Sequence, residues 1–85
     1  MQISILYFAR LREAIGYSSE TVEPPDGVRT LGQLRAWLIG RGDPWAQGFA
    51  SVQPVRVAQD QVVASDQTPL RDGAEVAFFP PVTGG

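Results

Sequence analysis

The hydrophobic residues are densest in two short runs near the two ends of the chain. Residues 2–8 read QISILYF and residues 75–79 read EVAFF, and in the first run apolar side chains occupy both sets of alternating positions. This pattern predicts a strand that is buried on both faces, or one whose second face meets a partner. Because these two segments are the most apolar, we expect them to lie side by side at the centre of a sheet.

The clearest helix signal starts at Thr30. Thr30 and Gln33 match a capping box, in which each side chain binds a backbone N–H at the start of the helix. Leu31, Leu34 and Leu38 follow at spacings of three and four, which predicts one apolar stripe along the helix. The residues GRGDP at 40–44 then end it.

Shorter elements surround this helix. Residues 11–15 predict a helical turn closed by Gly16, residues 18–23 a polar strand, and residues 55–58 and 62–64 the two strands of a hairpin. This order of elements predicts an α+β fold, a mixed sheet of about four to five strands with the main helix packed across one face.

The alternation of side chains also assigns the two faces of the sheet. We expect the helix to cover Ile3, Ile5, Tyr7, Val76 and Phe78. Phe8 and Phe79 then fall on the opposite face, together with Val63. An uncovered sheet face that bears two phenylalanines predicts a binding site for a partner protein.

The composition excludes most kinds of self-sufficient catalysis. All seven basic residues are Arg, and the sequence contains no Cys, His or Lys. It therefore lacks a thiolate nucleophile, an imidazole base and a Schiff-base lysine. The nine acidic residues are scattered, and we interpret Glu20 and Glu23 as solvated surface acids that point to opposite faces of a strand.

The charge pattern gives further expectations. The net charge is −2 with both signs interleaved, so we expect no nucleic-acid partner. The first apolar run is too short to span a membrane and no basic segment precedes it, so we expect a cytoplasmic protein without a membrane partner. We also expect no bound metal or cofactor.

The last six residues, PPVTGG, differ from the rest of the chain. We expect residues 1–79 to form one domain and residues 80–85 an extended tail, because Pro80 and Pro81 donate no backbone N–H. Val82 and Thr83 keep N–H groups that a partner strand could bind, and Gly84 and Gly85 are slim enough for a narrow channel. The terminal carboxylate could attack the α-phosphate of ATP to give an acyl adenylate. The residues alone leave open whether the tail does this or is an ordinary frayed terminus.

Three segments, ISILYFARLREAIG, TPLRDGAEVAFF and PPVTGG, give the sequence a resemblance to the small-subunit family of molybdopterin synthase. That family consists of sulfur carriers with a ubiquitin-like β-grasp fold. The resemblance implies that a partner enzyme adenylates Gly85 with ATP and that a cysteine desulfurase system supplies sulfur for a C-terminal thiocarboxylate. The large, catalytic subunit then receives the tail, and the sulfur goes to cyclic pyranopterin monophosphate to build the dithiolene.

The resemblance also assigns roles and an assembly. It implies a heterotetramer of two small and two large subunits, with the active site on the large subunit. Phe8 and Phe79 match aromatic positions of the family's partner-binding face, and Gly84 gives the tail clearance in the channel.

Three other functions fit the same residues. The chain could be a sulfur carrier for thiamine, cysteine or tRNA thiolation, since such carriers also end in Gly-Gly. It could be a protein modifier that conjugates through Gly85. It could also be a non-covalent interaction domain whose tail only docks.

Overall fold

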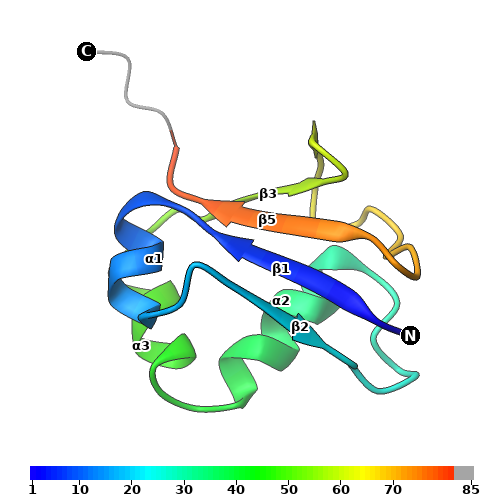
Figure 1. The fold of residues 1–85 in the computed structure, drawn as a ribbon, viewed down its shortest axis with the longest axis horizontal. Helices are drawn as coiled ribbons and strands as arrows, with labels where there is room; N and C mark the ends of the chain where they lie inside the picture. Colours follow the sequence, from blue (N-terminus) through cyan, green and yellow to red (C-terminus); the bar gives the residue numbers. More distant parts are fainter. Residues whose placement is uncertain (82–85) are drawn as a thin grey trace.

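The computed structural model describes residues 1–81. In chain order the elements are β1 (Ile3–Tyr7), α1 (Ala9–Ile15), β2 (Ser19–Val22), α2 (Leu31–Gly40), α3 (Trp45–Ser51), β3 (Arg56–Gln59), β4 (Val62–Val63) and β5 (Glu75–Phe79). Figure 1 shows the strands as one twisted layer with the helices gathered on one side of it. The predicted α+β class is confirmed.

The five strands form one mixed sheet in the order β2-β1-β5-β3-β4. The first and last strands are parallel neighbours at its centre, with Ile5 opposite Val76 and Tyr7 opposite Phe78. The pairs β1–β2, β3–β5 and β3–β4 are antiparallel. The expectation that the two apolar runs lie side by side is therefore confirmed.

The core lies between this sheet and the helices. The five strand residues assigned to the helix side are at most 1% exposed: Ile3, Ile5, Tyr7, Val76 and Phe78. The leucine stripe of α2 is fully buried against them. The Phe78 ring packs edge-on against Phe49 of α3, with centroids 5.3 Å apart. The predicted assignment of faces is confirmed for the covered side.

Local signals set the helix ends as the sequence predicted. The Gln33 N–H donates to Thr30 Oγ1, and Gln33 Oε1 accepts from the Thr30 N–H, both at 3.2 Å. Gly16 ends α1 with φ +90°, and its N–H donates to the Arg12 carbonyl at 2.8 Å. A residue with a side chain would be strained in that left-handed conformation.

A two-residue turn joins β3 to β4. Asp60 and Gln61 have φ of +51° and +70°, the twist that suits a two-residue hairpin. The Asp60 carboxylate accepts from the Glu75 N–H at 3.1 Å and from Arg71 at 2.6 Å. These hydrogen bonds lower the pKa of Asp60, the one from the Glu75 backbone most strongly. The turn is thereby tied to the start of β5.

The interpretation of Glu20 as a solvated surface acid is wrong. Glu20 pairs with Ile5 and points to the helix side, where its side chain is only 17% exposed. Its carboxylate accepts from Tyr7 Oη at 2.8 Å, Arg41 Nη2 at 2.9 Å and Trp45 Nε1 at 3.0 Å. We call these four residues the Glu20 cluster. Burial alone would raise the pKa of Glu20, but the hydrogen bonds from Arg41, Tyr7 and Trp45 outweigh it and lower that pKa.

Aromatic stacking completes the cluster. The Arg41 guanidinium lies over the Trp45 ring, 3.7 Å from its centroid, and Tyr17 stacks on the same ring at 6.1 Å. Burial and the neighbouring carboxylate raise the pKa of Tyr7, so its hydroxyl stays protonated and donates. The cluster joins two strands to the region between α2 and α3 at the partly exposed edge of the core.

Candidate functional site

The side of the sheet away from the helices carries a continuous row of apolar side chains. Leu6 lies opposite Ala77, Ala77 opposite Ala58, and Ala58 opposite Val63, so the row crosses four strands. We use the name open face for these four residues together with Phe8 and Phe79. Val63 is 65% and Phe8 45% exposed, Leu6, Ala77 and Phe79 are partly buried, and Ala58 is buried at 8% exposure. The register thus brings together the three residues that the sequence assigned to this face.

Phe8 and Phe79 lie at the end of the sheet where the tail begins. Phe8 is extended, with φ −122° and ψ 153°, and its N–H donates to the Phe78 carbonyl at 3.2 Å. Phe8 therefore continues the pairing of β1 with β5 by one residue and is level with Phe79. In Figure 1 the chain leaves β5 at the end of the sheet where β1 passes into α1.

A strained residue follows Phe8. Ala9 has φ +53°, in the left-handed region that residues other than Gly rarely adopt. The chain changes direction there, so that α1 packs with the helix layer through Leu11 and Ile15 while Phe8 stays on the open face. Backbone strain of this kind collects at functional sites when the surrounding structure enforces it.

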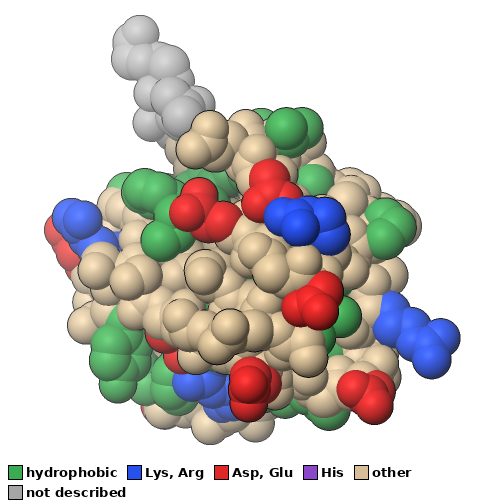
Figure 2. All heavy atoms as spheres, turned by 45° about the vertical axis from the view of Figure 1, so that its right-hand side comes forward, with side chains coloured by type: hydrophobic (Ala, Val, Ile, Leu, Met, Phe, Trp, Pro, Cys, Tyr) green, Lys and Arg blue, Asp and Glu red, His purple; other side chains and the backbone are tan. Residues whose placement is uncertain are grey.

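Only the first part of the tail is described. Pro80 and Pro81 directly follow β5, form no regular structure and are partly buried. The predictions for Val82, Thr83, Gly84 and Gly85 fall outside the described residues. In the view of Figure 2 acidic and basic side chains are interspersed, and one group of hydrophobic side chains lies beside the end of the described chain.

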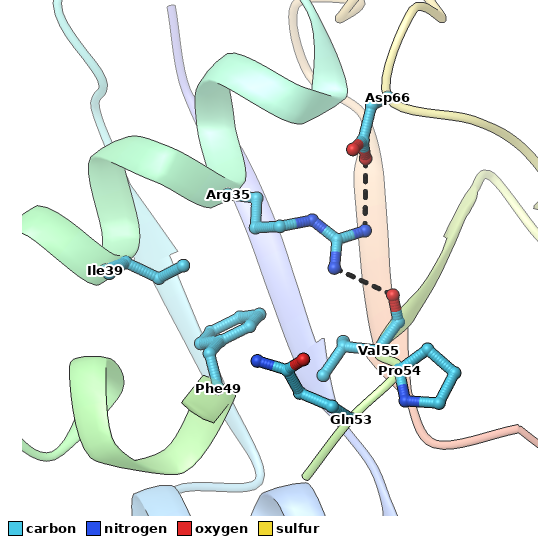
Figure 3. A pocket seen from close by; sticks show the side chains of 7 residues that line it. All are labelled: Arg35, Ile39, Phe49, Gln53, Pro54, Val55 and Asp66. Carbon is cyan, nitrogen blue, oxygen red and sulfur yellow. Dashed lines mark hydrogen bonds and ion pairs between the residues drawn. The ribbon is translucent and has the colours of Figure 1, made fainter. Parts of the chain in front are cut away.

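A separate pocket of about 290 Å³ lies on the helix side. Figure 3 shows its lining, in which Arg35 reaches from α2 toward the segment before β3. Its guanidinium donates to the Val55 carbonyl at 2.7 Å and to Asp66 at 3.1 Å. Arg35 thus ties loops to α2, and the pocket contains none of the residues that the sequence singled out.

Two kinds of feature are missing from the described residues. Among residues 1–81 there is no group of three or more His, Cys, Asp or Glu side chains placed to hold a metal ion. The helices within the same range are too short and too polar to cross a membrane.

Comparison with known proteins identifies the family. A family model described as the ThiS family matches residues 5–85. The chain belongs to the ThiS family. It is similar to the molybdopterin synthase sulfur carrier subunit of Escherichia coli K12, with 39% identity over 98% of this chain and 99% of that protein. The human protein of the same name is 35% identical over 99% of this chain and 94% of its own length.

Solved structures have a similar fold. SAMP1 from Haloferax volcanii superposes with a TM-score of 0.77 at 26% identity, and each chain is covered completely. A molybdopterin-converting factor subunit 1 from Pyrococcus furiosus gives a TM-score of 0.71 at 24% identity, over 96% of this chain and 99% of that one. The ubiquitin-like β-grasp fold that the resemblance implied is confirmed.

Sequence reasoning missed three members of the open face, Leu6, Ala58 and Ala77. Leu6 and Ala77 share the alternation of Phe8 and Phe79, so the signal was present in the strand pattern. They pass unnoticed because leucine and alanine in an apolar strand are usually core residues.

Proposed function

We propose that this ThiS-family chain is the sulfur carrier subunit of a molybdopterin synthase. The observation that carries the proposal is the 39% identity to a molybdopterin synthase sulfur carrier, which extends over 98% of the chain. The sequence ending PPVTGG supplies the group that such a role needs. In this function the chain carries a reactive sulfur and leaves catalysis to its large partner subunit.

The proposed chemistry takes place on the carboxylate of Gly85. One of its oxygens attacks the α-phosphate of ATP in an activating enzyme, pyrophosphate leaves, and an acyl adenylate forms. A persulfide of the desulfurase system then attacks the acyl carbon and displaces AMP, and a second thiol reduces the resulting acyl disulfide, which leaves a terminal thiocarboxylate and a protein disulfide. When the sulfur passes to cyclic pyranopterin monophosphate, water restores the carboxylate, so the chain returns unchanged. ATP is consumed by the partner, and we expect the carrier itself to bind no cofactor.

The arrangement of the described residues supports a docked carrier. The open face gives a partner an apolar surface, and the tail starts beside its two phenylalanines. Residues 80–85 can reach at most about 20 Å when fully extended. A large subunit that covers the open face would therefore hold the docking residues and Gly85 on one continuous surface. We propose that two small and two large subunits assemble in this way in the cytoplasm.

The test is the intact mass of the carrier after co-expression with its activating enzyme and desulfurase. We expect a mass increase equal to the replacement of one oxygen by sulfur, and we expect fragmentation to place it on Gly85. A chain lacking Gly85 is the control and should stay unmodified. In a strain without this gene, molybdoenzyme activity should disappear, and normal activity there would contradict the proposal. Loss of thiamine synthesis or tRNA thiolation instead would assign the carrier to another sulfur pathway.

A protein modifier is the second candidate, because the fold superposes on SAMP1, whose solved structures include one described as a small archaeal modifier protein. A modifier uses the same activated Gly85 but transfers it to amines of other proteins. It predicts a ladder of higher-mass adducts that depends on Gly85 and persists when the pterin substrate is absent. A sulfur carrier gives the thiocarboxylate mass without such a ladder.

A further inference from the structure

Arg56 places a positive charge at the tail end of the open face. It is the first residue of β3 and lies opposite Phe79 in the antiparallel register. The next residue, Val57, is 2% exposed and points into the core, so Arg56 points away from the helices. Its side chain is exposed.

The guanidinium of Arg56 has no hydrogen bond or ion pair within residues 1–81. Arg35, Arg41 and Arg71 each have a carboxylate oxygen at 3.1 Å or less, whereas Arg10, Arg12 and Arg29, like Arg56, have no ion pair within residues 1–81. The acidic residues of the outer side of the sheet lie toward its other end, where Glu75 is level with Ser4 and Asp60 binds Arg71. The end of the face nearest the tail is therefore positive and apolar.

Docking on this face would change the surroundings of Arg56. Directly opposed residues of an antiparallel pair have Cβ atoms about 5 Å apart, so a protein that covers Phe79 also removes water from Arg56. A charge taken out of water without a partner strongly opposes binding, whereas a carboxylate with good geometry compensates for the loss. The guanidinium fork suits a carboxylate because it can donate two parallel hydrogen bonds.

We propose that the partner presents a carboxylate to Arg56, beside an apolar groove that receives Phe8 and Phe79. The inference rests on the proposed function, because it takes the large subunit of molybdopterin synthase as that partner. It adds the chemistry of the partner surface, which is an acidic side chain at the point where the tail enters. The pair sets the orientation of the carrier and attracts it electrostatically before contact.

The experiment measures association and dissociation rates of the purified full-length carrier with the large subunit at several salt concentrations. Arg56→Gln should weaken binding by about 30-fold or more, mainly through faster dissociation because the partner carboxylate stays desolvated and unpaired, and Arg56→Glu should weaken it further and also slow association. Arg56→Lys keeps the charge but loses the bidentate contact, so it should recover the salt dependence and only part of the affinity. Arg56→Gln should flatten the salt dependence of association, and Arg56→Glu should shift it toward faster association at higher salt. Arg29→Glu is the matched control, since Arg29 is exposed on the loop before α2 and lies outside the open face.

Thermal unfolding of each variant verifies that its fold is intact, and Arg56→Gln retains the test if Arg56→Glu does not fold. The inference about Arg56 would be overturned if Arg56→Gln and Arg56→Glu both bound with wild-type affinity while Phe79→Ala abolished binding. That result would still support the open face as the docking surface. If Phe79→Ala and Phe8→Ala also bound the large subunit with unchanged affinity, the open face would not be the docking surface. The mass shift on Gly85 is measured independently of binding. It therefore shows whether the carrier function holds even when the Arg56 pair or the docking face is refuted.

Discussion

Replacing Glu20 with Gln tests the polar cluster at the edge of the core. The carboxylate accepts three hydrogen bonds, from Tyr7, Arg41 and Trp45, at 2.8–3.0 Å. A hydrogen bond to a charged group contributes about 1.5–3 kcal/mol and one between neutral groups about 1 kcal/mol, so each bond loses about 1 kcal/mol. Because the Glu20 side chain is still 17% exposed, we expect the total loss of unfolding free energy to be smaller than the sum over the three hydrogen bonds. We expect Glu20→Gln to lower the free energy of unfolding by about 2–3 kcal/mol.

Chemical and thermal unfolding measure this loss. In a domain of this size 1 kcal/mol corresponds to about 4–8 °C in Tm, so we expect Tm to fall by about 10–20 °C at pH 7. Glu23→Gln is the matched control, because Glu23 is exposed one residue beyond β2. It should change Tm by no more than a few degrees.

The pH dependence of the stability loss distinguishes an effect of the Glu20 charge from an effect of the side chain's shape. The pKa of Glu20 is lower in the folded chain than in the unfolded chain. Its contribution to stability is therefore complete above the unfolded pKa, near 4.3, and is lost as the pH falls through the lower folded value. The stability difference between wild type and Glu20→Gln should shrink across that acidic range. A difference below 0.5 kcal/mol at pH 7, or one that is as large in strong acid as at neutral pH, would refute the reasoning.

Two further substitutions test packing and backbone geometry. A Cβ at Gly48 would lie 2.8 Å from Ile15 Cγ1, so Gly48→Ala should cost about 1–3 kcal/mol of unfolding free energy in urea titrations. Gly40, with open space around it, is the control, and Gly40→Ala should be neutral or stabilising; equal effects at both positions would count against the packing argument. Ala9→Val should lower Tm because a β-branched residue is disfavoured at φ +53°, and Ala9→Gly should not. Equal melting temperatures for the two variants would show that the left-handed turn carries no strain.

The central part of the fold could be predicted because local signals and burial agree there. The capping box at Thr30 sets the start of α2 within one turn, and apolar residues on both faces of the first and last strands require a central position. The open face followed from alternation alone, since Phe8 and Phe79 have the opposite parity to the buried residues of their strands.

The Glu20 cluster could not be predicted because its members are far apart in the sequence. Tyr7, Arg41 and Trp45 come from β1, the end of α2 and the start of α3, and only the folded chain brings their donors to one carboxylate. A glutamate in a short polar strand has no local feature that distinguishes it from a solvated one. Arg56 has the same difficulty, since its position beside Phe79 depends on the register between β3 and β5.

The parallel pairing of β1 with β5 joins the first and the last strand of the sheet in chain order. While the ribosome is still making the chain, β1 lacks its central neighbour, and the sheet cannot close until β5 has emerged. Contacts between such distant segments also slow folding relative to local ones. Two of the six residues of the open face, Ala77 and Phe79, belong to β5. A chain that stops before β5 would therefore lack the tail together with Phe79, the proposed docking residue that lies where the tail begins.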